Sequence, residues 1–461
     1  MPIKFCFDEV YSAKDSLNIR ISLANRSRPL FNYWLAMCCL LAPDKMVELG
    51  ANELSGGEGP FVYAVELHFV MTEWCREHSD ESIVAISPQV LNALRQRRAI
   101  MMVSFAHEGR CHYESGSEWS ESSIFDALKK TAEEYDLESE QLWFVTGNLL
   151  ADDEEKAWIA DRGLKKSPFT LRSCELSSFG LGNAIRESIQ HGRGPVAVPL
   201  FQAKEPHRGW QQLKIGWSKR EYSGYRIGEE WEVPRWRYAC LNRQLRHHRW
   251  WVLERLFREN LLQYGKVTFP RMTESDLAIV GYEPIPLDLL PLVESLPISH
   301  EDRWVTESSR EFLAQNTYAV TATLPEVVRQ SAVEIVNETF YAEGRLVTEK
   351  TFKALTGRGP VVVVGSQGTL EYLRSIGVET WSDVIDEAYD QVGSPNDPTG
   401  DRGRFEACMD AVIPIISSES ESAKVAFACR RQSTSNLRWL IEASKPWDHL
   451  LEELEQVLAS L

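Results

Sequence analysis

The sequence predicts an α/β protein with two domains, each built on a parallel sheet covered by helices. The first observation is that apolar runs without polar alternation, such as Val361–Val364, recur between segments of helical periodicity. The second is the length of 461 residues, which exceeds what one ordinary core accommodates. We therefore expect two Rossmann-like domains that face each other across a cleft, with residues 1–235 forming the first and residues 236–461 the second.

Composition and charge limit the classes of protein to which the chain could belong. A hydrophobic content of 43% and a charged content of 25% are typical of soluble globular proteins. The net charge of −17 argues against a protein that coats nucleic acid electrostatically. Nine scattered cysteines without a C-x-x-C pair favour a reducing compartment. The longest apolar run, Phe31–Pro43, is too short to span a bilayer, so we expect a cytoplasmic protein without a membrane span.

The first domain alternates between predicted strands and predicted helices, which indicates a parallel sheet of the Rossmann type. The predicted strands are 19–23, 82–86, 99–105 and 141–146, and the predicted helices are 61–77, 88–97, 123–135, 154–162 and 183–190.

One acidic residue of this domain, Glu108, is predicted to lie at the carboxyl end of a strand, where a general base could act. Glu108 follows the strand 99–105, and the carboxyl ends of parallel strands face the ligand. We interpret Glu108 as a candidate general base, the alternative being a loop acid that caps the next segment. His107 and His112 are five residues apart and do not match the H-E-x-x-H pattern, so we expect no metal site.

Two other patterns in the first domain are more simply explained by structure. Gly180–Leu181–Gly182 precedes a predicted helix but lacks the third glycine of a dinucleotide-binding loop, so we interpret it as a turn. The segment 209–238 is dense in tryptophan and tyrosine, whose rings can stack on sugars or bases. Packing of these rings at a domain junction is the interpretation that we favour.

The second domain opens with a basic cluster between a predicted strand, 238–242, and a predicted helix, 250–260. The cluster contains Arg243, Arg246, His248 and Arg249. Fixed positive charge at a helix start opposes the helix dipole and destabilises the helix unless an anion binds there. We therefore expect an anion at this turn, with a merely solvated basic helix face as the alternative.

The triplet Thr348–Glu349–Lys350 opens a helix directly after an apolar strand. At the carboxyl end of a parallel strand, a glutamate suits ribose hydroxyls and a lysine suits a phosphate. The other predicted elements of this domain are strands at 332–336 and 361–364, a loop at 394–403, and helices at 326–330, 348–355, 368–375, 405–412, 423–429 and 447–461. The helix at 405–412 is expected to stop before Pro414.

These motifs resemble those of GT-B glycosyltransferases, nearest to the α-1,3-fucosyltransferases and related phage and bacterial proteins. The resemblance spans roughly residues 238–410. It is carried by LNRQLRHHRWWVLERL at 241–256, IVNETFYAEGRLVTEKTFKAL at 335–355, VVVVGSQGTLEYLRSIG at 361–377 and IDEAYD at 385–390. The chain departs from the family pattern at Ala354, where related sequences often have proline, and in an expanded loop at 394–403.

The resemblance implies a role for each matching residue. Glu349 would contact the nucleotide ribose and Lys350 the phosphates, while Arg249, with Arg246 as the competing candidate, would hold the diphosphate. Glu338 would lie on the side of the donor sugar. The other matching residues of the donor-nucleotide site are Asn242, Arg243 and His248.

The implied reaction is an inverting, metal-independent transfer of a hexosyl or fucosyl group from a nucleoside-diphosphate sugar. No D-x-D motif lies in an apolar strand context, so arginine, lysine and helix N-termini would stabilise the leaving diphosphate. The resemblance points to a GDP-linked donor as substrate, with no other cofactor. The acceptor hydroxyl would belong to a glycan, a protein or a modified base of phage-type DNA. The alternatives are a non-catalytic nucleotide-binding sensor or scaffold, and a dinucleotide-dependent oxidoreductase using the Gly180 turn.

Overall fold

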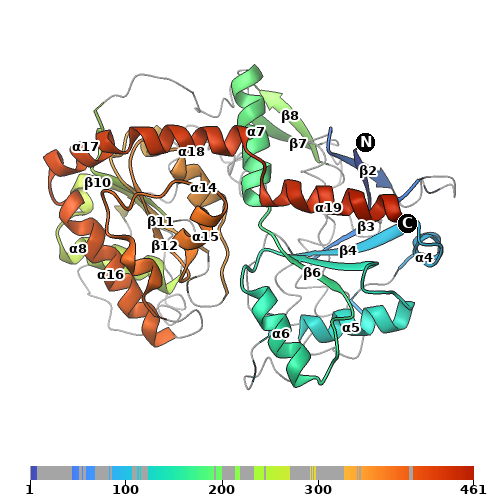
Figure 1. The fold of residues 1–461 in the computed structure, drawn as a ribbon. Coiled ribbons are helices and arrows are strands. Elements are labelled where there is room, and N and C mark those ends of the chain that lie inside the picture. The colour runs from blue at the N-terminus through green and yellow to red at the C-terminus, as the bar shows by residue number, and fades with distance from the viewer. Residues whose placement is uncertain are drawn as a thin grey trace. The chain divides into compact units, whose positions relative to one another are not determined.

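A computed structural model shows two compact units, each described by itself (Figure 1). The first unit comprises Met1–Asn183, Val196–Gly216 and Ser444–Leu461, and the second comprises Ala184–Pro195 and Trp217–Ala443. The structure describes residues 2–7, 44–50, 59–67, 86–105, 123–191, 194–199, 213–218, 233–242, 246–269, 326–339, 344–393 and 398–461, with a few single residues between these ranges. The predicted domain boundary near residue 235 adjoins residues 219–232, which lie outside the described ranges, and stays a prediction.

The first unit contains a six-stranded sheet in which every pairing is parallel. Its order is β2 (Met46–Gly50), β1 (Ile3–Phe7), β3 (Phe61–Glu66), β4 (Ala99–Phe105), β5 (Leu142–Thr146) and β6 (Thr170–Ser173). The direction of winding reverses between β1 and β3, which makes this the switch point of a doubly wound sheet.

Helices cover both faces of this sheet. Met101 and Val103 of β4 pack with α4 (Pro88–Arg95), α5 (Ile124–Tyr135) and α6 (Ala151–Asp161). Their neighbours Ile100 and Met102 pack with α7 (Ser177–His191) and α19 (Pro446–Ser460). Successive side chains of a strand point to opposite faces, so an apolar strand without alternation is what two covered faces require.

The carboxyl-terminal helix α19 belongs to the first unit, where it lies along the sheet in red in Figure 1. Its apolar stripe of Trp447, Leu450, Leu451, Leu454 and Leu458 recurs at helical spacing and is buried in the core. Glu453 of this helix also pairs with Arg172 of β6.

The second unit contains a four-stranded parallel sheet in the order β10 (Gly265–Thr268), β9 (Tyr238–Leu241), β11 (Glu334–Asn337) and β12 (Val361–Val364). Its switch point lies between β9 and β11. The connection from β9 to β10 and that from β11 to β12 run in opposite directions, so their right-handed crossovers place α8 (His247–Arg258) and α14 (Glu349–Leu355) on opposite faces. The fold class expected from the sequence, two parallel Rossmann-like sheets, is confirmed.

Further helices complete the second unit. Arg255 of α8 pairs with Glu406 and Asp410 of α16 (Pro398–Ile416), and Phe352 of α14 stacks on Trp439 of α18 (Arg430–Glu442). The remaining elements are α13 (Glu326–Arg329), α15 (Thr369–Ser375), α17 (Glu419–Ala428), and the 3-10 helices η6 (Leu262–Tyr264) and η7 (Glu387–Gln391). A separate two-stranded sheet pairs β7 (Gly194–Pro199) with β8 (Leu213–Ser218), and most residues of both strands belong to the first unit.

Four local predictions are wrong. Phe61–Glu66 forms a central strand and not the start of a helix, because a short apolar run has no periodicity that separates the two states. Gly180–Leu181–Gly182 lies inside α7 and is not a turn. The predicted loop at 394–403 is helical from Pro398 onward, and α16 continues through Pro414 to Ile416.

Within the described ranges, no helix has the length and apolar character needed to cross a bilayer.

Candidate functional site

The predicted donor residues that the structure describes gather at the carboxyl edge of the second sheet. Asn242 directly follows β9, and Glu338 directly follows β11, on either side of the switch point. The helices α8 and α14 begin at the same edge, with Arg249 and Lys350 in their first turns. Ligands of open parallel sheets bind at this place because strand ends and helix N-termini converge there.

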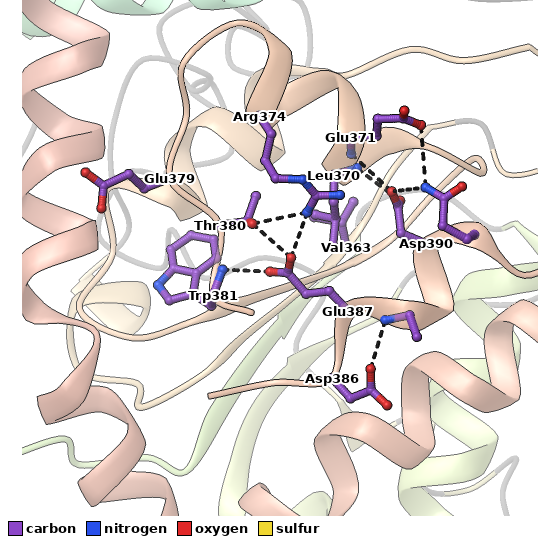
Figure 2. A network of polar contacts seen from close by, with 12 residues as sticks. Val363, Leu370, Glu371, Arg374, Glu379, Thr380, Trp381, Asp386, Glu387 and Asp390 are labelled. Carbon is purple, nitrogen blue, oxygen red and sulfur yellow. Dashed lines mark hydrogen bonds and ion pairs between the residues drawn. The ribbon is translucent and has the colours of Figure 1, made fainter. Parts of the chain in front are cut away.

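Helix α15, which follows β12 at this edge, already carries an acid at its start. The Asp390 carboxylate accepts hydrogen bonds from the backbone N–H of Leu370 at 3.0 Å and of Glu371 at 3.1 Å (Figure 2). Asp390 lies in η7 and is buried. The amino end of α15 is therefore satisfied from within the protein.

Figure 2 also shows Glu387, a second acid, which contacts the last turn of α15 and the segment that follows this helix. Glu387 accepts hydrogen bonds from the Trp381 N–H at 2.6 Å and the Thr380 hydroxyl at 2.8 Å, and it pairs with Arg374 at 2.8 Å. Burial raises the pKa of Glu387, although its hydrogen bonds and Arg374 oppose that rise. These partners account for the acidic IDEAYD segment as a structural element.

Helix α8 begins differently. Its N-cap residue is Arg246, whose side chain makes no capping hydrogen bond. The next positions are His247, His248 and Arg249, and the first turn contains no acid. Positive side chains therefore stand where the helix dipole is also positive, an arrangement that an anionic ligand would stabilise.

Arg249 is the buried centre of this basic turn. Its side chain is 3% exposed and its Nη2 donates to the backbone carbonyls of Glu338 at 3.2 Å and Asn337 at 3.4 Å. Burial and, second, the charge of Arg246 lower the pKa of Arg249 to about 10. The guanidinium thus remains charged at neutral pH, held against the end of β11.

The imidazole of His248 is uncharged and holds the start of α8 in place. Its Nε2 lies 2.8 Å from the carbonyl oxygen of Glu338, so this nitrogen must carry the proton and donate it. Burial lowers the pKa of His248 well below its ordinary value, and the neighbouring Arg249 lowers it further. The imidazole is therefore neutral and fixes the start of α8 to the end of β11.

Lys350 and Glu349 lie side by side in the first turn of α14. The Lys350 Nζ is 3.1 Å from the hydroxyls of Thr339 and Thr348 and 3.6 Å from Glu349 Oε1. Both side chains are partly exposed, at 33% for Lys350 and 27% for Glu349. Burial raises the pKa of Glu349, but Lys350 and Lys353 outweigh this effect and the net shift is downward. A charged acid and a lysine are thus available to a ligand.

Both carboxylate oxygens of Glu338 accept hydrogen bonds from within the protein. Its Oε1 accepts from the Thr348 N–H at 2.9 Å and the Thr351 hydroxyl at 2.6 Å. Its Oε2 accepts from the Thr348 hydroxyl at 2.6 Å and the Thr339 N–H at 3.2 Å. The fully buried carboxylate ties the end of β11 to the start of α14. This is a positioning role, and direct contact with a donor sugar stays a prediction.

Asn242 belongs to a buried amide pair with Asn337, a residue that sequence reasoning missed. Asn337 Nδ2 donates to Asn242 Oδ1 at 2.9 Å, and the Asn242 N–H donates to the Thr268 hydroxyl at 2.9 Å. The pair joins the carboxyl ends of three adjacent strands, β9, β10 and β11. The position of Asn337 could have indicated its role. It is the last residue of an apolar strand and directly precedes Glu338, so it lies at the same edge of the sheet.

Arg243 and Glu108 lie outside the described residues, so their predicted roles are untested. His112 is described and buried, with Nε2 2.7 Å from the Thr146 hydroxyl and the ring 5.2 Å from that of Phe144. Burial lowers its pKa to about 3, so this neutral histidine is part of the first unit's core. Among the described residues, no group of three or more histidine, cysteine or acidic side chains could hold a metal ion.

No protein-family model and no curated protein matches the chain. It is similar in structure to a candidate UDP-N-acetylglucosamine 2-epimerase from Listeria monocytogenes, with a TM-score of 0.34, 10% identity, and coverage of 99% of this chain and 98% of that one. The DNA-modifying enzyme β-glucosyltransferase is similar with a TM-score of 0.33 and 6% identity, and the match covers 99% of this chain and 100% of that one. The glycosyltransferase of kitacinnamycin is similar with a TM-score of 0.32 and 11% identity, and the match covers 99% of this chain and 100% of that one. Likenesses of this size decide neither an activity nor a substrate, and none of the three is described as a fucosyltransferase.

Proposed function

We propose that the second unit binds the diphosphate of a nucleotide sugar and that the protein transfers the sugar to an acceptor hydroxyl. The observation that carries this proposal is the start of α8. This helix of 12 residues has Arg246 at its N-cap and Arg249 in its first turn, and that turn contains no acidic residue. Two phosphates offer the negative charge that this turn lacks.

Lys350 and Glu349 extend the proposed site toward the rest of the nucleotide. The Lys350 ammonium would add a third positive charge for the diphosphate, and the ionised Glu349 would accept hydrogen bonds from ribose hydroxyls. Departure of a nucleoside diphosphate requires stabilisation of the charge that develops on it, and fixed cations can provide this. The transfer is therefore proposed to be metal-independent.

The acceptor side of the reaction rests on Glu108 as the proposed base. In an inverting displacement it would remove the proton of the acceptor hydroxyl while the hydroxyl oxygen attacks the anomeric carbon and the diphosphate leaves. The acceptor is proposed to be a glycan, a protein or a modified base of phage-type DNA. A GDP-linked sugar is the first donor to test.

Calorimetric titration with GDP, UDP, dTDP, CMP and NAD tests the donor site. We expect one nucleoside diphosphate to bind, and Lys350→Met to weaken that binding about tenfold, which corresponds to about 1.4 kcal/mol. Lys424→Met is the matched control, because Lys424 is an exposed lysine of α17 that pairs with Glu421. Thermal unfolding of each variant checks that the fold is kept.

The absence of diphosphate binding, or binding indifferent to Lys350→Met, would contradict the proposed site. Turnover then separates an enzyme from a non-catalytic nucleotide sensor. Donor hydrolysis or transfer that persists in EDTA supports the proposed metal-independent enzyme, whereas tight binding without any turnover supports the sensor.

A further inference from the structure

We infer that Arg404 is a positioning residue that sets the geometry of the diphosphate site from α16, an inference that rests on the proposed function. Arg404 is 2% exposed and lies in the interior of the second unit. It is not one of the residues that the sequence patterns point to. Its contacts reach residues that follow β11, β12 and η7.

Arg404 holds three backbone carbonyls. The Arg404 guanidinium donates from Nη2 to the Tyr341 carbonyl at 2.6 Å, from Nε to the Gly365 carbonyl at 3.1 Å, and from Nη1 to the Val392 carbonyl at 3.4 Å. These acceptors follow β11, β12 and η7 in turn. One planar group with several donors thus fastens three irregular segments that no sheet ladder holds together.

A chain of ring contacts leads from Arg404 to α8. The guanidinium carbon of Arg404 lies 4.4 Å from the ring centroid of Tyr341. The Tyr341 ring stacks on the His248 imidazole, with centroids 5.2 Å apart and an interplanar angle of 17°. Trp251, one turn further along α8, meets the same tyrosine edge-on at 6.0 Å.

The path ends at the groups proposed to bind phosphate. His248 is the second residue of α8 and lies between Arg246 and Arg249 in the chain. Its imidazole is also tied to the Glu338 carbonyl, which Arg249 contacts as well. Displacement of Tyr341 would therefore move the first turn of α8 and, with it, both arginines. Binding sites need such a supporting layer because small displacements of a charged group weaken its contacts.

A purely structural arginine would produce a different result from a positioning one. Loss of a structural arginine lowers the melting temperature but leaves the affinity of the folded fraction unchanged. Loss of a positioning arginine weakens the binding of the phosphates selectively. The informative readout is the ratio of nucleoside diphosphate affinity to nucleoside affinity, measured on folded protein below the melting transition.

The experiment compares four variants of the full chain by calorimetry, using the nucleoside diphosphate that binds the wild-type protein and its nucleoside. Arg404→Lys keeps the charge but cannot form the same fork of hydrogen bonds. Tyr341→Leu removes the ring, and Tyr341→Phe keeps it. Arg431→Lys is the control, because Arg431 is an exposed arginine of α18 that pairs with Glu379.

We expect Arg404→Lys and Tyr341→Leu to weaken diphosphate binding about tenfold relative to nucleoside binding, with Arg431→Lys within about twofold of wild type. Tyr341→Phe should bind at least about fivefold more tightly than Tyr341→Leu, because it keeps the stack on His248. If Arg404→Lys does not fold, the two Tyr341 variants decide the question.

The two proposals fail in distinguishable ways. Diphosphate binding that is lost in Lys350→Met but unchanged in Arg404→Lys and Tyr341→Leu overturns the inference about Arg404 and leaves the proposed function standing. A wild-type protein that binds no nucleoside diphosphate overturns the proposed function, and the inference falls with it.

Discussion

Helices α8 and α15 begin at the same edge of one sheet, each after a parallel strand, yet opposite charges meet their first turns. At α15 the buried Asp390 carboxylate accepts hydrogen bonds from two backbone N–H groups. At α8 the helix's own N-cap residue is Arg246, and Arg249 lies in its first turn. Both helices present the positive end of their dipole at this edge. The protein itself supplies an acid to the start of α15, and we propose that a bound anion takes that place at α8.

This difference has a consequence for stability and binding. An acidic side chain that caps a helix start raises the free energy of unfolding. Positive side chains at a helix start lower the free energy of unfolding but can bind an anion. The comparison between α8 and α15 can therefore be tested by changing the charge at each start and measuring both quantities.

The largest expected effect comes from giving α8 the kind of acid that α15 has. Arg246→Asp removes a cation from the proposed diphosphate site and places a favourable N-cap side chain at the same position. We expect nucleoside diphosphate affinity to fall at least about thirtyfold, or about 2 kcal/mol, while the free energy of unfolding rises by about 1 kcal/mol. Calorimetry and denaturant unfolding measure the two changes.

Arg258→Asp is the control for this variant. It makes the same change of charge in the last turn of α8, where Arg258 pairs with Glu254. Because an acid opposes the dipole at a C-terminus, this variant should lose stability and keep its affinity. Equal loss of binding in both variants would show that net charge, and not the start of α8, governs the affinity.

A smaller effect is expected from removing the internal anion of α15. Asp390→Ala leaves the N–H groups of Leu370 and Glu371 without their acceptor, so the free energy of unfolding should fall by about 1–2 kcal/mol. Nucleoside diphosphate affinity of the folded protein should change less than twofold. A large loss of affinity would mean that α15, like α8, takes part in binding.

The smallest expected effect is a pH dependence at the same position. Burial raises the pKa of Asp390, and the two N–H groups only partly oppose this rise. Because the folded pKa lies above the unfolded value, the carboxyl group's contribution to stability is complete below the unfolded pKa of about 3.9 and declines as pH rises through the folded pKa.

Asp390→Asn cannot titrate and should lack this decline. The stability advantage of the wild type over Asp390→Asn is therefore expected to be greatest in acid and to shrink with rising pH. Denaturant unfolding of both proteins from pH 4 to pH 7 measures the difference. An advantage that grows with pH would show that the charged form of Asp390 is the favoured one.

Local patterns predicted much of the second unit. The four β-branched residues of β12 could only form a strand buried on both faces, and Thr348 was a recognisable start for α14, where its hydroxyl accepts from the Lys350 N–H at 3.4 Å. The basic turn at α8 was visible because its charges oppose the helix dipole. These features depend on residues that are close in sequence, so a short window contains the necessary information.

Contacts between distant residues were not predictable in the same way. Asp390 caps a helix 20 residues away, and Arg404 contacts the carbonyl of Tyr341 63 residues away. The sequence patterns predict neither β1 nor β2, and they predict a helix at Phe61–Glu66, because the place of this segment between β1 and β4 depends on pairing partners elsewhere in the chain.

Patterns in the sequence were sufficient to predict the fold class, most of the helices and strands of the second unit, and the types of residue at the candidate site. The three-dimensional arrangement was needed to show which acid accepts hydrogen bonds from which helix, that Glu338 accepts four internal hydrogen bonds, and that α19 belongs to the first unit. The physical reason is that propensity, periodicity and capping act over a few residues, whereas charge pairing and burial depend on which segments the fold brings together.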